Sequence, residues 1–283
     1  QAGGSYVGRK GYIEYLPGTL PLVLSAPHGG DLRPIEIPDR TYGTMARDTN
    51  TRELALQIRD KLKDQTGFYP HIIISHLHRT KLDPNREVVE AAQGDPEAIR
   101  AWWEFQTFIE NAERLVEESH GEGLYIDLHG HGHDIQRLEL GYLLSSTELF
   151  NSDETLSTAP YYLDSSFRAL AEKPGVNFAD LIRGPLSLGA LLEDRGFPAV
   201  PSQNQPHPAG NPYFSGGYNT ARHGSRSGGS ISGVQIECNY QNVRDAEFNR
   251  DAFAEALGDA LQTFFPAHFG MPFAPASGQT PGT

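Results

Sequence analysis

The sequence contains a single cysteine, Cys238, among its 283 residues. An intrachain disulfide needs two cysteines, and so does a zinc knuckle built on a Cys-x-x-Cys pair. Uninterrupted apolar stretches are short, and none approaches the 18 or more residues that a membrane-spanning helix requires. These shortages argue against a disulfide scaffold, a cysteine-based zinc site and a transmembrane helix.

Basic residues are also scarce, because 23 Lys and Arg stand against 36 Asp and Glu, for a formal net charge of −13. Nucleic acid is therefore not an expected partner, since binding to phosphates requires clustered Lys and Arg. We expect no membrane partner either. Glycine and proline are plentiful, with 30 and 20 residues, which is typical of a loop-rich protein rather than a helical bundle.

The length fits one large domain or two small ones, and no boundary is visible within it. We expect a single domain over residues 1–270, followed by a flexible tail at 271–283 that is rich in Pro, Gly, Ser and Thr. The start at Gln1 and this tail favour a secreted or periplasmic protein. A cytoplasmic location is the alternative.

Apolar periodicity predicts strands that alternate with helices. Strands are expected at residues 22–26, 72–74, 124–128, 138–144 and 231–238. Helices are expected from Asp48 or Thr49 to Gly67, from Asp95 to Val116, around 188–192 and over 245–265, and residues 198–229 are expected to form a long loop. The predicted fold class is α/β, with a mixed, mostly parallel sheet flanked by helices.

Three of the predicted strands end in reactive side chains, namely His28, His129 and Glu237. Sites in α/β sheets usually lie at the carboxyl ends of the strands. The two histidines are candidate ligands of zinc, which binds imidazole nitrogen and carboxylate oxygen. A single such histidine is more often an ordinary hydrogen-bonded residue, but the run His129-Gly130-His131-Gly132-His133 favours a metal site.

The third ligand should be acidic. Three acidic residues that follow His28 are candidates, namely Asp31, Glu36 and Asp48. Asp127 is a candidate for orienting an imidazole from behind. Glu237 lies in an apolar strand, where burial should raise its pKa and suit it to act as a general base, although a structural salt bridge would also explain it.

Arg79 and Arg86 follow a buried strand and are seven residues apart. Guanidinium groups bind carboxylates through paired hydrogen bonds, so these two residues could clamp an anionic substrate. A solvated surface turn is the alternative from composition alone. Cys238 alternates with Glu237 along a strand, so it faces the core and makes a poor nucleophile.

Five short motifs occur in a fixed order: Pro27-His28-Gly29-Gly30, Arg79-x-x-x-Asp83-x-Asn85-Arg86, Asp127-x-His129, Gly216-Gly217-Tyr218 with His223-Gly224, and Gln235-Ile236-Glu237-x-Asn239. This set resembles the N-formylglutamate amidohydrolase family, and it is more distantly similar to zinc carboxypeptidases, aspartoacylase and phage poly-γ-glutamate hydrolases. The motifs span about residues 20 to 245.

The resemblance implies a zinc-exopeptidase-like fold and a single catalytic domain with one zinc ion per chain. The implied ligands are His28, His129 and an acid that matches Asp48 best. Glu237 resembles the general acid/base, and Arg79 the residue that polarises the scissile carbonyl. The remaining implied roles are substrate contacts, made by Asn85, Arg86, Tyr218 and His223.

The activity implied is hydrolysis of an amide bond in a carboxylate-bearing substrate, such as N-formylglutamate, another N-acyl amino acid or a peptide. An exported carboxypeptidase or amidase acting on peptides, polyglutamate or cell-wall stems is an alternative. So is a non-catalytic binding module of the same fold. A serine or cysteine hydrolase is disfavoured, because no Gly-x-Ser-x-Gly motif is present.

Overall fold

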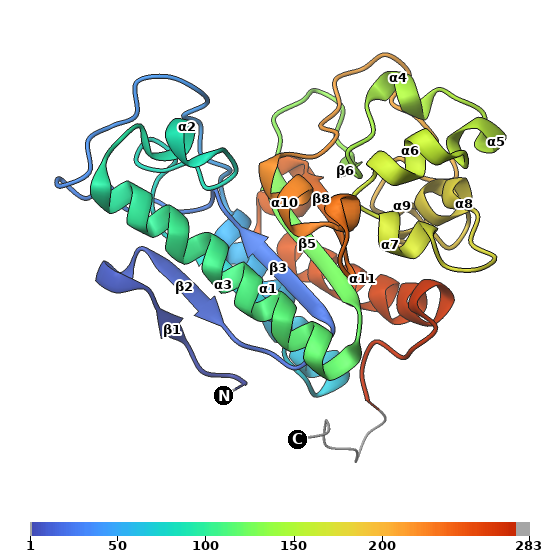
Figure 1. The fold of residues 1–283 in the computed structure, drawn as a ribbon, viewed down its shortest axis with the longest axis horizontal. Helices are drawn as coiled ribbons and strands as arrows, with labels where there is room; N and C mark the ends of the chain where they lie inside the picture. The colour runs from blue at the N-terminus through green and yellow to red at the C-terminus, as the bar shows by residue number, and fades with distance from the viewer. Residues whose placement is uncertain (1, 276–283) are drawn as a thin grey trace.

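The computed structural model describes residues 2–275, which form one sheet with helices on both faces (Figure 1). The strand order is β1-β2-β4-β3-β5-β8-β6-β7. The strands are β1 Tyr6–Val7, β2 Ile13–Leu16, β3 Leu22–Ala26, β4 His71–Ser75, β5 Gly123–Gly130, β6 Leu138–Gly141, β7 Ala199–Val200 and β8 Ile231–Cys238. The four central strands β4, β3, β5 and β8 are mutually parallel, and β1, β2 and β6 pair antiparallel. The sheet is thus mixed and mostly parallel, as predicted.

Three long helices cover the sheet, α1 (Thr51–Thr66), α3 (Pro96–His120) and α11 (Glu247–Phe264). The shorter helices are α2 Val88–Ala92, α4 Ser146–Leu149, α5 Asp153–Leu156, α6 Ala159–Asp164, α7 Arg168–Ala171, α8 Phe178–Arg183, α9 Leu188–Glu193 and α10 Tyr218–His223. Short helical turns occur at η1 Arg9–Gly11, η2 Ser225–Ser227, η3 Tyr240–Arg244 and η4 Phe265–Phe269. Within residues 2–275, none of the helices combines the length and apolar character needed to cross a membrane.

The sheet separates two apolar layers. Helices α1 and α11 pack against each other on one face, where Leu54, Ile58 and Leu257 are buried with the strand residues Leu24 and Ile126. Helix α3 covers the opposite face, as Figure 1 shows. Burial on both faces explains why the central strands are continuous apolar runs rather than alternating ones.

Helix α3 begins as its sequence predicts, because the side chain of Asp95 caps the backbone N–H groups of Glu97 and Ala98 and Pro96 follows. Helix α1 differs from the prediction. Its N-terminal cap is Asn50, in the left-handed conformation with φ 66°, and not Asp48 or Thr49. Asp48 is thereby left outside the helix, with its carboxylate free for the site.

Other differences lie in the second half of the chain. Five short helices, α4 to α8, occupy a segment where no helix was predicted, and the expected loop at 198–229 contains β7 and α10. In α11, the apolar residues Phe248 and Ala252 are exposed, whereas Phe253 and Leu257 are buried. Phe273, inside the expected tail, is buried against Phe265, whereas residues 276–283 lie outside the described residues.

Candidate active site and metal centre

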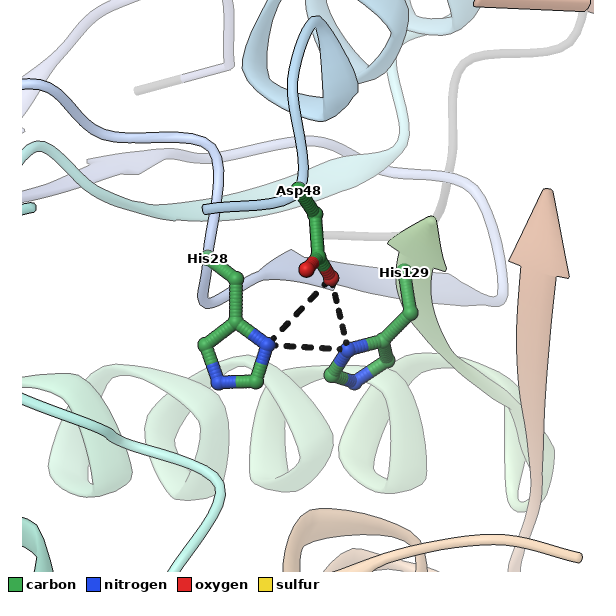
Figure 2. A group of neighbouring side chains, drawn as sticks. All are labelled: His28, Asp48 and His129. Carbon is green, nitrogen blue, oxygen red and sulfur yellow. Dashed lines mark hydrogen bonds and ion pairs between the residues drawn. The ribbon is translucent and has the colours of Figure 1, made fainter. Parts of the chain in front are cut away.

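Three side chains converge beyond the carboxyl ends of the central strands, as Figure 2 shows. The Nδ1 atoms of His28 and His129 lie 3.1 Å apart, and each lies 3.3 Å from Oδ2 of Asp48. All three residues are buried. The structure therefore brings together the three residues predicted as metal ligands, hereafter the His28–Asp48–His129 cluster.

Backbone contacts bring these residues from distant parts of the chain to one point. His28 follows β3 and His129 lies at the end of the neighbouring parallel strand β5. The N–H of Asp48 donates to the carbonyl of His28 at 3.1 Å, which pins the loop before α1 to the end of β3. The N–H of Gly130 donates to Oδ2 of Asp48, also at 3.1 Å, and fixes the carboxylate.

Each imidazole also contacts a second carboxylate, through the ring nitrogen that points away from the cluster. Nε2 of His28 lies 2.7 Å from Oδ1 of Asp83, and Nε2 of His129 lies 2.7 Å from Oδ2 of Asp127. When a carboxylate accepts the Nε2–H of a histidine, the lone pair is left on Nδ1 and becomes more basic. Both imidazoles therefore aim Nδ1 lone pairs into the cluster.

The spacing of the cluster fits a small tetrahedral cation. Zinc bonds of about 2.0–2.1 Å in a tetrahedral arrangement place neighbouring ligand atoms about 3.3 Å apart. The distances in the cluster are 3.1 Å between the nitrogens and 3.3 Å from each nitrogen to the carboxylate oxygen. Two lone pairs and a carboxylate so close together repel one another unless a positive charge lies between them, so this donor set suits a divalent cation.

The pKa shifts of His129, Asp48 and Asp83 also indicate that positive charge is stabilised in the cluster. Burial alone would lower the pKa of His129, but Asp127 and Asp48 outweigh it and raise the pKa well above its usual value. Burial alone would raise the pKa of Asp48, but His28 and His129 hold it well below its usual value. The pKa of Asp83 is also lowered, because His28 and Arg79 outweigh the effect of burial. Removing either imidazole would leave a buried carboxylate without its partner.

Glu237 lies in β8, directly opposite His129 of β5. Burial raises its pKa to about 8, and the neighbouring acids Asp48, Glu139 and Asp127 add to the effect. The side chain of Gln235 donates to its carboxylate at 3.1 Å. Glu237 is thus a buried carboxyl with a raised pKa beside the cluster, as predicted, and Cys238 is buried in the core.

The cluster opens into a cavity of about 320 Å³. It is lined by the cluster together with Arg79, Asn85, Arg86 and Glu237. Nε of Arg79 donates to Asp83 at 2.9 Å, so this guanidinium is held in place from one side. Arg86 is about one-third exposed, and its Nη1 donates to the carbonyl of Asn85 at 2.7 Å. Seven of the nine predicted site residues therefore share one cavity.

The other two predicted site residues, Tyr218 and His223, do not line this cavity. Tyr218 packs on Trp102 of α3, and Nε2 of His223 lies 2.7 Å from Oε1 of Gln106. Both belong to α10, which lies within the expected loop at 198–229 but forms a helix packed on α3 and the sheet. Their side chains serve that packing.

The two alternative acids for the third ligand also lie elsewhere. Asp31 is exposed and lies 3.6 Å from the guanidinium of Arg52. Glu36 accepts a hydrogen bond from Tyr12 at 2.6 Å. Asp48 is the one of the three acids that lies beside both histidines.

Asp83 lies in one of the sequence motifs without a predicted role, and Asn219 is a further residue of the site that the sequence does not indicate. Asn219 lies in α10, where its N–H donates to Oδ1 of Asn85 at 2.8 Å and its side chain lies 3.4 Å from Asp127. The spacing Arg79-x-x-x-Asp83 was the available signal for Asp83. No local signal marks Asn219, because its contacts reach across more than 90 residues of sequence.

No protein-family model matches the chain, and no curated protein matches it in sequence. Among solved structures, it is similar to the N-formylglutamate amidohydrolase from Ralstonia eutropha JMP134, at 13% identity and a TM-score of 0.55, with 91% of this chain and 97% of that one covered. The chain has that fold.

Two further solved structures fall below a TM-score of 0.5. A gene product from Agrobacterium tumefaciens matches at 13% identity and a TM-score of 0.48, over 88% of this chain and 94% of that one. The N-acetylmuramyl-L-alanine amidase from Mycobacterium smegmatis matches at 11% identity and a TM-score of 0.39, over 87% of this chain and 97% of that one.

Proposed function

We propose that this protein is a zinc-dependent hydrolase that cleaves an amide bond in a substrate carrying a free carboxylate. The observation that carries the proposal is the His28–Asp48–His129 cluster, which shares one cavity with the buried carboxyl of Glu237. The resemblance in fold to an N-formylglutamate amidohydrolase supports the same reaction class.

The residues of the chain divide the chemistry between them. A zinc ion held by the cluster supplies Lewis acidity, which acidifies water and stabilises negative charge on oxygen. Glu237 accepts a proton from the attacking water and delivers it to the leaving amine. Burial favours this role, because a carboxyl with a pKa near 8 both takes up and releases a proton close to neutral pH.

The arginines and Asn85 provide the positive and polar side of the cavity. Arg86 is exposed enough for its guanidinium to meet an incoming carboxylate, and Asn85 lies beside His129 at 3.3 Å. Arg79 is buried and oriented by Asp83, so it is suited to stabilise the oxyanion that develops on the scissile carbonyl.

Two substrate classes fit this proposal, N-acyl amino acids such as N-formylglutamate and short peptides with a terminal carboxylate. An exported enzyme would act on peptides, polyglutamate or cell-wall stems. A non-catalytic module of the same fold is the competing function, and it would bind an acidic ligand without turnover.

The test combines metal analysis with an assay. We expect about one zinc per chain in the purified protein, lost in His129→Ala and kept in His76→Ala, whose histidine pairs with Glu14 away from the cluster. Hydrolysis of N-formylglutamate or a peptide ending in glutamate should disappear with a chelator and return with zinc. A zinc-loaded protein that hydrolyses none of these amides would overturn the proposal and favour the binding module.

A further inference from the structure

His133 lines the cavity and pairs with Glu139, and the proposed chemistry uses neither side chain. Nδ1 of His133 lies 2.8 Å from Oε1 of Glu139, and the imidazole stacks on Phe214 at 4.8 Å with an interplanar angle of 11°. Glu139 is buried and is the cross-strand partner of Glu237 on β8, so both carboxylates project from the same face. His133 and Phe214 line the same cavity as the cluster.

The hydrogen bonds of Glu139 determine what His133 presents to a ligand. Oε2 of Glu139 accepts the backbone N–H of Phe214 at 2.8 Å, and Oε1 faces Nδ1 of His133. As a carboxylate, Glu139 can only accept, so Nδ1 of His133 carries a proton, and in the neutral imidazole the lone pair is on Nε2. No hydrogen bond reaches Nε2 from the part of the chain that the structure describes. In its neutral form, His133 is therefore an oriented hydrogen-bond acceptor.

A second metal centre is the obvious alternative, because His131 lies next to this pair. Both nitrogens of His131 are already engaged, however. Its Nε2 donates to the carbonyl of Arg137 at 2.8 Å, and its Nδ1 accepts the N–H of His133 at 3.1 Å. Oε2 of Glu139 is likewise engaged with Phe214. With these atoms engaged, the group is better suited to bind an organic ligand than a cation.

Contacts of the two residues place His133 across the cluster from Arg86. Nε of Arg86 lies 3.3 Å from Glu90 of α2, and Nδ1 of His133 lies 2.8 Å from Glu139 of β6. Figure 1 shows α2 and β6 on opposite sides of β3 and β5, the strands that carry the two histidines of the cluster at their ends. If Arg86 holds the carboxylate of the leaving amino acid, His133 therefore lies on the acyl side of the scissile bond.

We infer that His133, held by Glu139 and Phe214, binds the acyl part of the substrate through an N–H donor, so that the preferred substrates are peptides rather than N-formyl amino acids. The inference rests on the proposed function for the direction of the substrate. A formyl group ends at the scissile carbon and cannot extend to His133. A peptidyl acyl group continues beyond that carbon and carries N–H groups that a lone pair on Nε2 can accept.

The test compares three ligands that share glutamate as the leaving part. They are N-formylglutamate, glycylglutamate and N-propionylglutamate, of which the last two have equal numbers of non-hydrogen atoms but end in an ammonium donor or a methyl group. Turnover by the zinc-loaded wild type tests the proposed function. Dissociation constants measured by calorimetry in a Glu237→Gln background test the inference, whether or not the wild type turns the ligands over.

We expect the Glu237→Gln protein to bind glycylglutamate about tenfold more tightly than N-propionylglutamate. Adding His133→Phe, which retains an aromatic ring on Phe214, should bring this ratio close to one and leave N-formylglutamate binding within about twofold. The matched control is His207→Phe, because His207 stacks on Phe150 outside this cavity. A ratio that His133→Phe leaves unchanged would overturn the inference.

Glu139→Gln provides a second test that keeps the shape of the pair. The glutamine carbonyl would accept the Phe214 N–H and its amide would donate to Nδ1, which moves the imidazole proton to Nε2. His133 would then be a donor, and the preference for glycylglutamate over N-propionylglutamate should be lost. Zinc analysis of the His133→Phe protein completes the test, since a second zinc that disappears with His133 would establish a metal centre and contradict the inference.

Discussion

At the scale of single residues, Glu237 is the side chain whose ionisation should control the rate. It must be a carboxylate to accept a proton, so kcat/KM should fall as the pH is lowered through its pKa. Burial raises that pKa to about 8, and a cation in the neighbouring cluster lowers it, so the fall should lie below pH 8. The check is a profile of kcat/KM from pH 5 to 9, and a rate that increases towards acid would contradict the assignment.

Replacing Glu237 separates catalysis from metal binding. Glu237→Gln should reduce kcat by about 10²–10⁴-fold, because the amide cannot accept the proton. The zinc content should stay at the wild-type level, since the three cluster ligands are unchanged. Glu118→Gln, at an exposed position on α3, is the control and should keep full activity. Near-wild-type turnover of Glu237→Gln would remove Glu237 from the mechanism.

The carboxylates behind the histidines make a prediction about affinity. Asp127→Asn removes the negative charge 2.7 Å from Nε2 of His129 and makes the ligand less basic. We expect zinc affinity to fall by about 10–100-fold, measured by competition with a chelator. Asp60→Asn, on the exposed face of α1, should leave the affinity unchanged. Equal affinities for wild type and Asp127→Asn would show that His129 needs no such support.

The candidate site residues differed in how well the sequence predicted them. His28 and His129 were predictable because each follows an apolar strand, and strand ends meet at one edge of a parallel sheet. The residues alone left Asp31, Glu36 and Asp48 open, and the family resemblance favoured Asp48. The hydrogen bond from Asp48 N–H to the carbonyl of His28 shows how the loop brings Asp48 to the histidines. The role of Asn219 could not be predicted from the local sequence, because its partners come from β5 and from the connection after β4.

At the scale of elements, the turn after β3 positions His28 through close backbone packing. Gly30 lies so near the carbonyl of His76 that an added Cβ would overlap it, and that carbonyl also accepts the N–H of Leu32 at 2.9 Å. Gly30→Ala should therefore destabilise the fold by about 1–3 kcal/mol and weaken zinc binding.

Gly132→Ala is the matched control for this change. An added Cβ at Gly132 meets nothing within 4 Å, so its free energy of unfolding should stay within about 0.5 kcal/mol of wild type. Urea unfolding of both variants measures the difference. Equal stabilities would show that the turn can relax away from β4.

Long elements were predictable and short ones were not. Helix α3 carries a capping Asp95, an N-terminal Pro96 and apolar residues at helical spacing over 25 residues, which together specify it. Helices α4 and α5 contain four residues each, too few to establish a period. Tertiary packing decides such segments, and their apolar residues, such as Leu149 and Leu156, are buried in the main core.

At the scale of the whole molecule, the sheet order turns a linear sequence into a site. His28, His129 and Glu237 are separated by up to about 200 positions in the sequence. They nevertheless lie on or just beyond the neighbouring strands β3, β5 and β8. The order itself was not predictable from periodicity, because it depends on which strands pair across long connections. The prediction of a shared edge succeeded because it required only that the strands be parallel.

The stability of the whole fold should depend on pH through a histidine far from the site. His71 is buried in β4, and its Nδ1 accepts the hydroxyl of Tyr15 at 2.7 Å, which requires the neutral ring. Burial lowers its pKa from 6.5 to about 4. Between pH 6.5 and about pH 4, His71 is therefore protonated in the unfolded chain but neutral in the folded chain. The contribution of His71 to stability is complete above pH 6.5 and is lost as the pH falls towards 4.

The size of this effect is on the order of 3 kcal/mol, because each pKa unit corresponds to about 1.4 kcal/mol. His71→Gln retains an acceptor for Tyr15 but does not titrate, so the variant should lose less stability than the wild type between pH 7 and pH 4.5. Urea unfolding at the two pH values measures both losses, and subtracting one from the other removes the contribution of the carboxylates. Equal losses in the two proteins would mean that protonated His71 is accommodated in the folded state.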